Sequence, residues 1–304
     1  MTAAATAWVW AGAAEKPTEP PLPEGVVVIR DLTYRYFGEQ RLALDLYLPA
    51  DAGPPTAGTG ELRPAIVAVH GGSWVGGSKR DYGPQFARFA EHGIVVAVVD
   101  YRLARPGAPS WDGALEDVAA AVDWLGVYAE TYRVDTDRLA IVGTSAGGFL
   151  AAHIGLGTPL RSYMAGARQQ VKAAVCLSTP TSLVELAAFR SLKHDPLRDL
   201  MGLSSGDLDN MVRTKLNEWV TLISHRARPM LLIHGTDDLW VPISQARELH
   251  KRLGWMAIPS RLIEINGARH GFELRVEAPS PRDLLPDVLD FLNEVWRERA
   301  SDAA

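Results

Sequence analysis

The sequence predicts a doubly wound α/β domain, in which a mostly parallel sheet is covered by helices on both faces. Two observations lead to this fold class. After residue 64 the chain alternates between short, continuously apolar runs and longer stretches with helical spacing of their apolar residues. Strands buried on both faces lose polar alternation, and strands that alternate with helices form parallel crossovers. A pair of earlier strand-like runs adds an antiparallel start to this sheet.

Composition narrows the function classes. Hydrophobic residues make up 47% and charged residues 22% of the 304 residues, which is typical of a globular protein with a sizeable core. The formal net charge is -5, with both signs dispersed, which argues against nucleic acid as a partner because phosphate binding needs a basic surface. No apolar run approaches the roughly 18 residues of a membrane span.

The N-terminal stretch "MTAAATAWVWAGAAEKP" has apolar and small residues before Glu15 but no Lys or Arg ahead of them. We therefore expect residues 1–24 to be a flexible tail or the remaining part of a trimmed leader peptide. The first alternative fits a cytoplasmic protein and the second a periplasmic or secreted one, and both stay open.

Two early strands come next, "GVVVIRDLTYR" and "RLALDLYLP", and the short "YFGEQ" between them predicts an antiparallel hairpin. In the second strand a leucine recurs at every other position, which predicts a half-buried strand. These alternating leucines are Leu42, Leu44, Leu46 and Leu48. "LPADAGPPTAGTGELRP" then predicts a surface loop rich in Pro and Gly.

The strands and helices that follow predict a single domain over residues 25–298 and a tail over 299–304. In the helix at 114–130, Leu115, Val118, Val122 and Leu125 fall on one face. The expected strands are 65–72, 94–102, 139–145, 171–178, 229–235 and 260–266. The expected helices are 82–93, 114–130, 146–156, 243–253 and 284–296.

Residues 179–228 interrupt this alternation, because about fifty Leu-rich residues carry no clear strand pattern. A structureless loop of that length is unusual in a compact domain, so we expect a helical lid. It follows a strand, which would place it over the crevice where open α/β sheets bind ligands.

The segment "LAIVGTSAGGFLAAHIGL" places Ser145 between two glycines, after an apolar strand and before a helix of small residues. Gly143 to Gly147 match the G-x-S-x-G pattern of a nucleophile elbow in the strand–turn–helix context that the pattern requires. A second match, Gly202 to Gly206, follows "RDLM" and precedes "DLDNM", which indicates a loop with a helix cap.

A serine hydroxyl needs a base, and the base needs an orienting acid. In folds with this elbow the acid follows the serine and the histidine comes last. "LLIHGTDDLWVP" offers Asp237 and Asp238; we favour Asp238, since related loops read D-x-x-V-P. "INGARHGFE" follows the last strand and makes His270 the candidate base. We assign ordinary surface or core roles to His92, His153, His194, His225 and His250.

The segment "VAVHGGSWVGGSKRD" follows the first core strand, as an HGGG-type oxyanion motif does. We expect the backbone N–H groups of Gly71, Gly72 and Ala146 to form the oxyanion hole and His70 to be structural. The segment lacks the G-x-x-x-x-G-K-[ST] spacing of a phosphate-binding loop. Trp74 and Tyr101 are candidates for the rim of the substrate crevice or for packing.

These motifs together resemble the α/β-hydrolase superfamily, and within it the HGGG-bearing esterases: hormone-sensitive-lipase-like carboxylesterases and the feruloyl, acetyl-xylan and arylformamidase relatives. The matching residues are His70 to Trp74, Asp100 to Leu103, Gly143 to Gly147, Asp238 to Pro242, and His270 to Phe272. Ser73 stands where the lipase-type motif has its third glycine, which is closer to the feruloyl-esterase and formamidase side. The resemblance implies hydrolysis through an acyl-enzyme, without cofactor or metal.

The predicted function is therefore that of a serine carboxylic-ester hydrolase for small to medium esters, with Ser145, Asp238 and His270 as its triad. An amide or lactone hydrolase would use the same triad. A catalytically inert binding protein with this fold would lack a triad residue or would have a blocked oxyanion hole. The sequence shows neither defect. The expected partner is a small-molecule ester, and the sequence is also compatible with a homo-oligomer.

The only cysteine, Cys176, lies in "VKAAVCLS", so an intrachain disulfide is excluded. A small buried residue is the expected role of its side chain.

Overall fold

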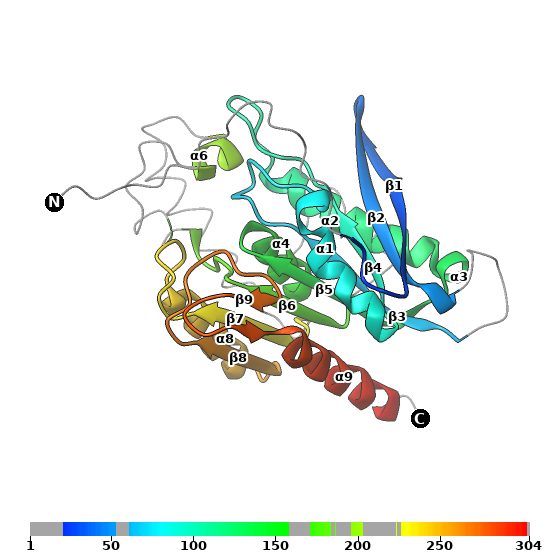
Figure 1. Ribbon diagram of the computed structural model, residues 1–304. Helices are drawn as coiled ribbons and strands as arrows, with labels where there is room; N and C mark the ends of the chain where they lie inside the picture. Colours follow the sequence, from blue (N-terminus) through cyan, green and yellow to red (C-terminus); the bar gives the residue numbers. More distant parts are fainter. Residues whose placement is uncertain are drawn as a thin grey trace.

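The computed structural model describes residues 21–52, 61–157, 171–183, 186, 196–202, 223 and 226–302. Eight strands form the central sheet in the order β1-β2-β4-β3-β5-β6-β7-β8, with β1 and β8 at its two edges (Figure 1). The strands are β1 (Val26–Phe37), β2 (Gln40–Pro49), β3 (Arg63–Val69), β4 (Val95–Val99), β5 (Val134–Thr144), β6 (Ala173–Leu177), β7 (Met230–Gly235) and β8 (Ser260–Ile265).

The sheet is mixed but mostly parallel, as the sequence predicts. The pairs β1–β2 and β2–β4 are antiparallel, and every pair from β4–β3 to β7–β8 is parallel. The hairpin turn between β1 and β2 holds only Gly38 and Glu39. A further small sheet pairs β9 (Arg275–Val276) with β10 (Arg282–Asp283), which the sequence pattern does not predict.

Helices cover both faces of the sheet. One apolar cluster joins α2 (Trp111–Val127), α4 (Ala146–Leu156) and α8 (Ile243–Trp255) to one face. A second joins α1 (Lys79–Phe86), the 3₁₀ turn η2 (Ala87–His92) and α9 (Leu285–Asp302) to the other. The remaining short elements are η1 (Ala50–Ala52), α3 (Ala129–Tyr132) and α6 (Pro196–Met201).

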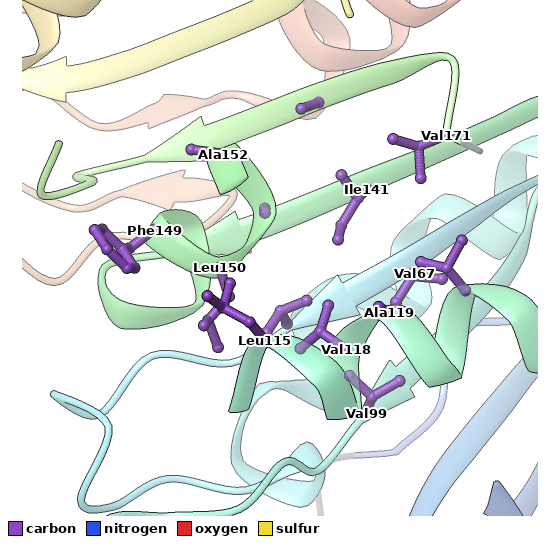
Figure 2. Packing of buried hydrophobic residues seen from close by; sticks show 14 of the residues in the cluster. Val67, Val99, Leu115, Val118, Ala119, Ile141, Phe149, Leu150, Ala152 and Val171 are labelled. Carbon is purple, nitrogen blue, oxygen red and sulfur yellow. The ribbon is translucent and has the colours of Figure 1, made fainter. Parts of the chain in front are cut away.

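The four residues predicted to share one face of α2 are all buried in the first cluster. Figure 2 shows two of them, Leu115 and Val118, on α2 beside Leu150 of α4, with Val67 and Ile141 on the strands. Successive residues of a strand point to opposite faces, so Val67 belongs to the first cluster and its neighbour Ile66 to the second. Both faces of β3 are therefore apolar.

Strand β2 is not half-buried, contrary to the alternation of its leucines. Ala43, Asp45 and Tyr47, which lie between those leucines, are buried as well. The reason is tertiary: α1 packs against this strand, and a Cβ on Gly83 would stand 2.2 Å from the Tyr47 hydroxyl oxygen. The polar Asp45 is tolerated because it forms ion pairs with Lys79 and Arg30.

Several helix boundaries differ from the sequence pattern; α2, for example, spans Trp111–Val127 rather than residues 114–130. Helix α1 begins at Lys79 rather than at residue 82, because the Asp100 carboxylate accepts the Lys79 backbone N–H at 2.7 Å. Such a bond satisfies one of the free N–H groups at a helix start, and its partner is 21 residues away. Helix α9 continues to Asp302, beyond the expected helix end at residue 296 and the expected domain end at residue 298.

Several expectations fall on residues outside the described ranges. These are residues 1–20 of the expected tail, most of the lid at 179–228, the second G-x-S-x-G match after Gly202, and His194 and His225. In the part of the chain that is described, no helix is both long and apolar enough to cross a membrane. Cys176 lies buried in β6, where burial raises the pKa of its thiol to about 12.

Candidate active site

Three loops at the carboxyl ends of parallel strands carry the predicted site residues. Ser145 joins β5 to α4, Asp238 lies between β7 and α8, and His270 follows β8. Because the carboxyl ends of parallel strands meet at one edge of a sheet, these loops come together although they are far apart in the sequence.

Ser145 occupies a strained turn. Its φ of 51° and ψ of -119° are rarely adopted by a residue with a side chain. The turn is held by the Ser145 N–H, which donates to the Leu177 carbonyl oxygen at 2.8 Å. A Cβ on Gly143 would stand 2.2 Å from the Gly147 oxygen, and one on Gly147 would stand 2.2 Å from the Val69 oxygen. The glycines of the motif are thus required for close backbone packing.

The imidazole of His270 lies between the serine and an aspartate. Its Nε2 is 2.9 Å from Ser145 Oγ, and its Nδ1 is 2.7 Å from Asp238 Oδ2. A carboxylate can only accept, so Nδ1 carries the proton and Nε2 is left to accept the serine hydroxyl. The neighbouring Asp237 instead accepts a bond from the Thr236 hydroxyl. The geometry is that of a nucleophile, its base and an orienting acid.

Asp238 is held as a carboxylate by four donors. Oδ1 accepts the backbone N–H groups of Trp240 and Val241, both at 2.8 Å. Burial alone would raise the pKa of Asp238, but hydrogen bonds from His234 and His270 and from the Val241 amide hold that pKa well below its usual range. The carboxylate therefore stays negative and can stabilise a cationic His270.

His234 is a site residue that the sequence reasoning did not consider. It is buried at the end of β7, where its Nε2 lies 2.9 Å from the Val241 carbonyl oxygen and 3.3 Å from Asp238 Oδ2. Both partners only accept, so Nε2 carries the proton. The one available signal is its place in "IHGTDD", four residues before Asp238, but the spacing alone does not indicate that the loop folds back onto the imidazole.

Replacing His234 with leucine is expected to lower kcat by about ten- to a hundredfold, because a hydrogen bond to a charged group contributes about 1.5–3 kcal/mol. His234→Gln, whose amide can donate from a similar position, should recover most of the loss. Steady-state kinetics on an ester substrate measure both.

His250→Leu is the matched control for His234→Leu. His250 also donates or accepts one side-chain bond, at 2.9 Å to Ser260 Oγ, but it does not touch the triad. Its kcat should stay near that of the unmodified protein. If His234→Leu and His234→Gln lowered kcat equally, the result would contradict a role for the Nε2–H of His234 as a hydrogen-bond donor.

The loop after β3 is tied down from several sides. His70 Nδ1 donates to the Gly71 carbonyl oxygen at 2.7 Å, and the His70 ring stacks on Tyr101 with centroids 4.3 Å apart. The Tyr101 hydroxyl donates to the His70 carbonyl oxygen at 3.2 Å. Burial lowers the pKa of His70, which keeps the imidazole neutral. These contacts place His70 in the support of the loop.

The backbone of this loop closes into a turn beside the serine. The N–H groups of Val75 and Gly76 donate to the Gly72 carbonyl oxygen at 3.1 and 3.0 Å. A Cβ on Gly71 would stand 3.3 Å from Ser145 Cβ, so the loop backbone adjoins the nucleophile. Ala146 is the first residue of α4, and its N–H has no carbonyl one turn earlier in the helix.

The two candidate rim residues are both buried. Trp74 is 3% exposed and meets Phe149 edge-on, with ring centroids 5.5 Å apart. Tyr101 is 2% exposed and lies under His70. Within the described ranges, no group of three or more His, Cys, Asp or Glu side chains could hold a metal ion.

Comparison with known proteins finds a matching family and similar esterases. The family model BD-FAE matches residues 44–253, which is more than half of the chain. Esterase LipC of Mycobacterium tuberculosis is 28% identical over 263 residues, covering 79% of this chain and 60% of LipC. The chain thus spans about half to three fifths of the length of the curated relatives it matches.

Solved structures extend the likeness over nearly the whole chain. Native esterase 2 of Thermogutta terrifontis has a TM-score of 0.67 and 26% identity, covering 92% of this chain and 94% of that one. The same esterase has been solved with propionate bound and phosphorylated by paraoxon. Esterase B of Lactobacillus rhamnosis, at 20% identity and a TM-score of 0.71 over 93% of this chain and 91% of that one, shares the fold.

Proposed function

We propose, because this chain belongs to the BD-FAE family of α/β-hydrolase esterases, that it is a serine carboxylesterase acting on small to medium esters. The observation that carries the proposal is the continuous hydrogen-bonded series from Ser145 through His270 to Asp238. Its atoms are already within the range that proton transfer requires.

The reaction follows from the direction of these bonds. His270 Nε2 takes the Ser145 proton as Oγ attacks the ester carbonyl carbon, and the carbonyl π electrons move onto the oxygen. Asp238 stabilises the imidazolium that forms. When the tetrahedral intermediate collapses, the carbon–oxygen bond to the alcohol breaks, and His270 protonates the departing alkoxide. Water then repeats the sequence on the acyl-enzyme and releases the acid.

The developing oxyanion is assigned to the backbone N–H groups of Gly72 and Ala146, whereas the Gly71 N–H, the third donor expected from the sequence, lies against the Tyr82 hydroxyl oxygen. Support comes from the turn at Gly72, from the position of Gly71 against Ser145, and from the free N–H expected at the start of α4. Hydrogen-bond donors fixed in such a site often supply the largest part of the rate enhancement of an acyl-transfer enzyme. We assign Trp74 and Tyr101 to packing beneath this loop, since both are buried against its neighbours.

We assign an ester, rather than an amide or a lactone, as the substrate class because the relatives and structural neighbours named above are esterases. The triad itself does not decide the leaving group. Rates on p-nitrophenyl acetate, a nitroanilide of the same acid, a small lactone and a feruloyl ester separate these options. Faster turnover of the anilide or the lactone than of every ester would overturn the assignment.

A fluorophosphonate probe is expected to label the protein at Ser145, because its phosphorus accepts attack by an activated serine and the adduct resembles the tetrahedral intermediate. Peptide mass spectrometry should find the mass increase on the peptide that contains residue 145. An inert protein with the same fold would stay unlabelled. A label on any other serine would equally refute the proposed nucleophile.

A further inference from the structure

Tyr82 is a second hydroxyl beside the nucleophile, supplied by α1. A Cβ built on Gly71 would stand 2.9 Å from the Tyr82 hydroxyl oxygen and 3.3 Å from Ser145 Cβ. The phenol oxygen and the Ser145 Cβ therefore both lie against Gly71, as does the Thr144 carbonyl oxygen, 3.1 Å from the same point.

The surroundings of Tyr82 keep its hydroxyl protonated. Burial, and then the charges of Glu273 and Asp81, raise the pKa of Tyr82 to about 12, and the Gly71 amide beside the phenol oxygen offsets part of that rise. In the described part of the chain, no carbonyl or carboxylate accepts a hydrogen bond from this hydroxyl. At neutral pH the group is a donor with its proton uncommitted.

The position of Tyr82 is fixed by the residues next to it in α1. The Lys79 N–H is held by Asp100 at 2.7 Å, and the Lys79 ammonium pairs with Asp45 at 2.8 Å. The following residue, Gly83, lies so close to Tyr47 that a Cβ would be 2.2 Å from its hydroxyl oxygen. The helix can neither turn about its axis nor withdraw without breaking these contacts, so the phenol is preorganised.

We propose that the Tyr82 hydroxyl is a catalytic residue that donates a hydrogen bond to the oxyanion of the tetrahedral intermediate. The inference rests on the proposed ester hydrolysis and extends it. The Gly71 amide faces the phenol oxygen, and its dipole makes the hydroxyl a stronger donor. No covalent bond of the phenol forms or breaks: its proton stays on oxygen while the negative charge appears on the substrate.

The test is Tyr82→Phe, which removes one oxygen atom and leaves the ring. We expect kcat on p-nitrophenyl acetate to fall by about 10²-fold, the usual effect of losing one oxyanion donor, with KM changed less than twofold. The inhibition constant of an alkyl trifluoromethyl ketone, which forms a tetrahedral oxyanion on the serine, should rise by the same factor as kcat/KM falls. A purely structural role would not produce this match.

Tyr132→Phe is the matched control. Tyr132 also carries a phenol, but it packs on Trp124 next to the opposite end of β5, so kcat and inhibitor affinity should not change. If Tyr82→Phe keeps kcat within twofold, or raises KM while kcat is unchanged, the hydroxyl is no oxyanion donor. Those results leave probe labelling of Ser145 intact, whereas failure of the proposed function would remove that labelling.

Discussion

Replacing Ser145 with alanine is expected to reduce kcat for ester hydrolysis by about 10⁴- to 10⁶-fold, the range seen when a triad nucleophile is removed. In the proposed mechanism this hydroxyl attacks the carbonyl carbon, and its Oγ lies 2.9 Å from His270 Nε2. Steady-state kinetics with a p-nitrophenyl ester measure the loss.

The stability of Ser145→Ala should be close to that of the unmodified protein. Alanine meets the same backbone strain at a φ of 51°, and the turn is held by the backbone N–H of residue 145, which the substitution keeps. Thermal unfolding checks this.

The chain offers a matched serine for comparison. Ser260 Oγ lies 2.9 Å from His250 Nδ1, the same separation as in the Ser145–His270 pair. Ser260→Ala removes that hydroxyl from a pair outside the triad, so it should retain full activity. Residual turnover above about a hundredth of the original rate in Ser145→Ala would refute the assignment of the nucleophile.

Replacing Lys79 with methionine is expected to lower the free energy of unfolding by about 3 kcal/mol, the lower end of the usual cost of breaking a buried ion pair, because the buried Asp45 keeps Arg30 as its one remaining cation in the described residues. Lys79 is 2% exposed, and its Nζ lies 2.8 Å from both Asp45 and Asp31. The Asp45 side chain is 0% exposed, so water cannot replace the lost ammonium. Urea unfolding at pH 7 measures the change.

Two further variants test this explanation. Lys172→Met removes a pair at 3.0 Å in which Asp137 is largely exposed, and it should cost less than about 1 kcal/mol. The double variant Lys79→Met/Asp45→Leu should be more stable than Lys79→Met alone, because Asp45 is then not left fully buried with only the partly exposed Arg30 as its cation. If Lys79→Met lowered the free energy of unfolding as little as Lys172→Met does, the result would contradict a stabilising buried ion pair between Lys79 and Asp45.

The sequence predicts the succession of strands and helices and the three triad positions because both depend on local patterns. Apolar runs and their spacing define the strands, and Ser145 and His270 follow such runs directly. The sequence distinguishes Asp238 from Asp237 because Asp238 stands four positions before Pro242, as the D-x-x-V-P pattern requires. The structure brings these three side chains together as expected.

The contacts that surround the triad depend on three-dimensional packing and were not predictable in this way. His234 meets Asp238 only because the loop after β7 turns back on itself. Lys79 and Asp45 are 34 positions apart and pair through the docking of α1 on β2. Tyr82 lies next to Gly71 for the same reason, and nothing in "KRDYGPQF" distinguishes it from a surface tyrosine.

The single sulfhydryl of this molecule has a practical consequence. Cys176 is inside the sheet with its pKa raised to about 12, so maleimides and other alkylating reagents find no reactive thiolate on the folded protein. A cysteine introduced at any exposed position can then be tagged with one fluorophore or spin label without background. Movements of the segments around the catalytic serine could be followed spectroscopically without first removing a native thiol.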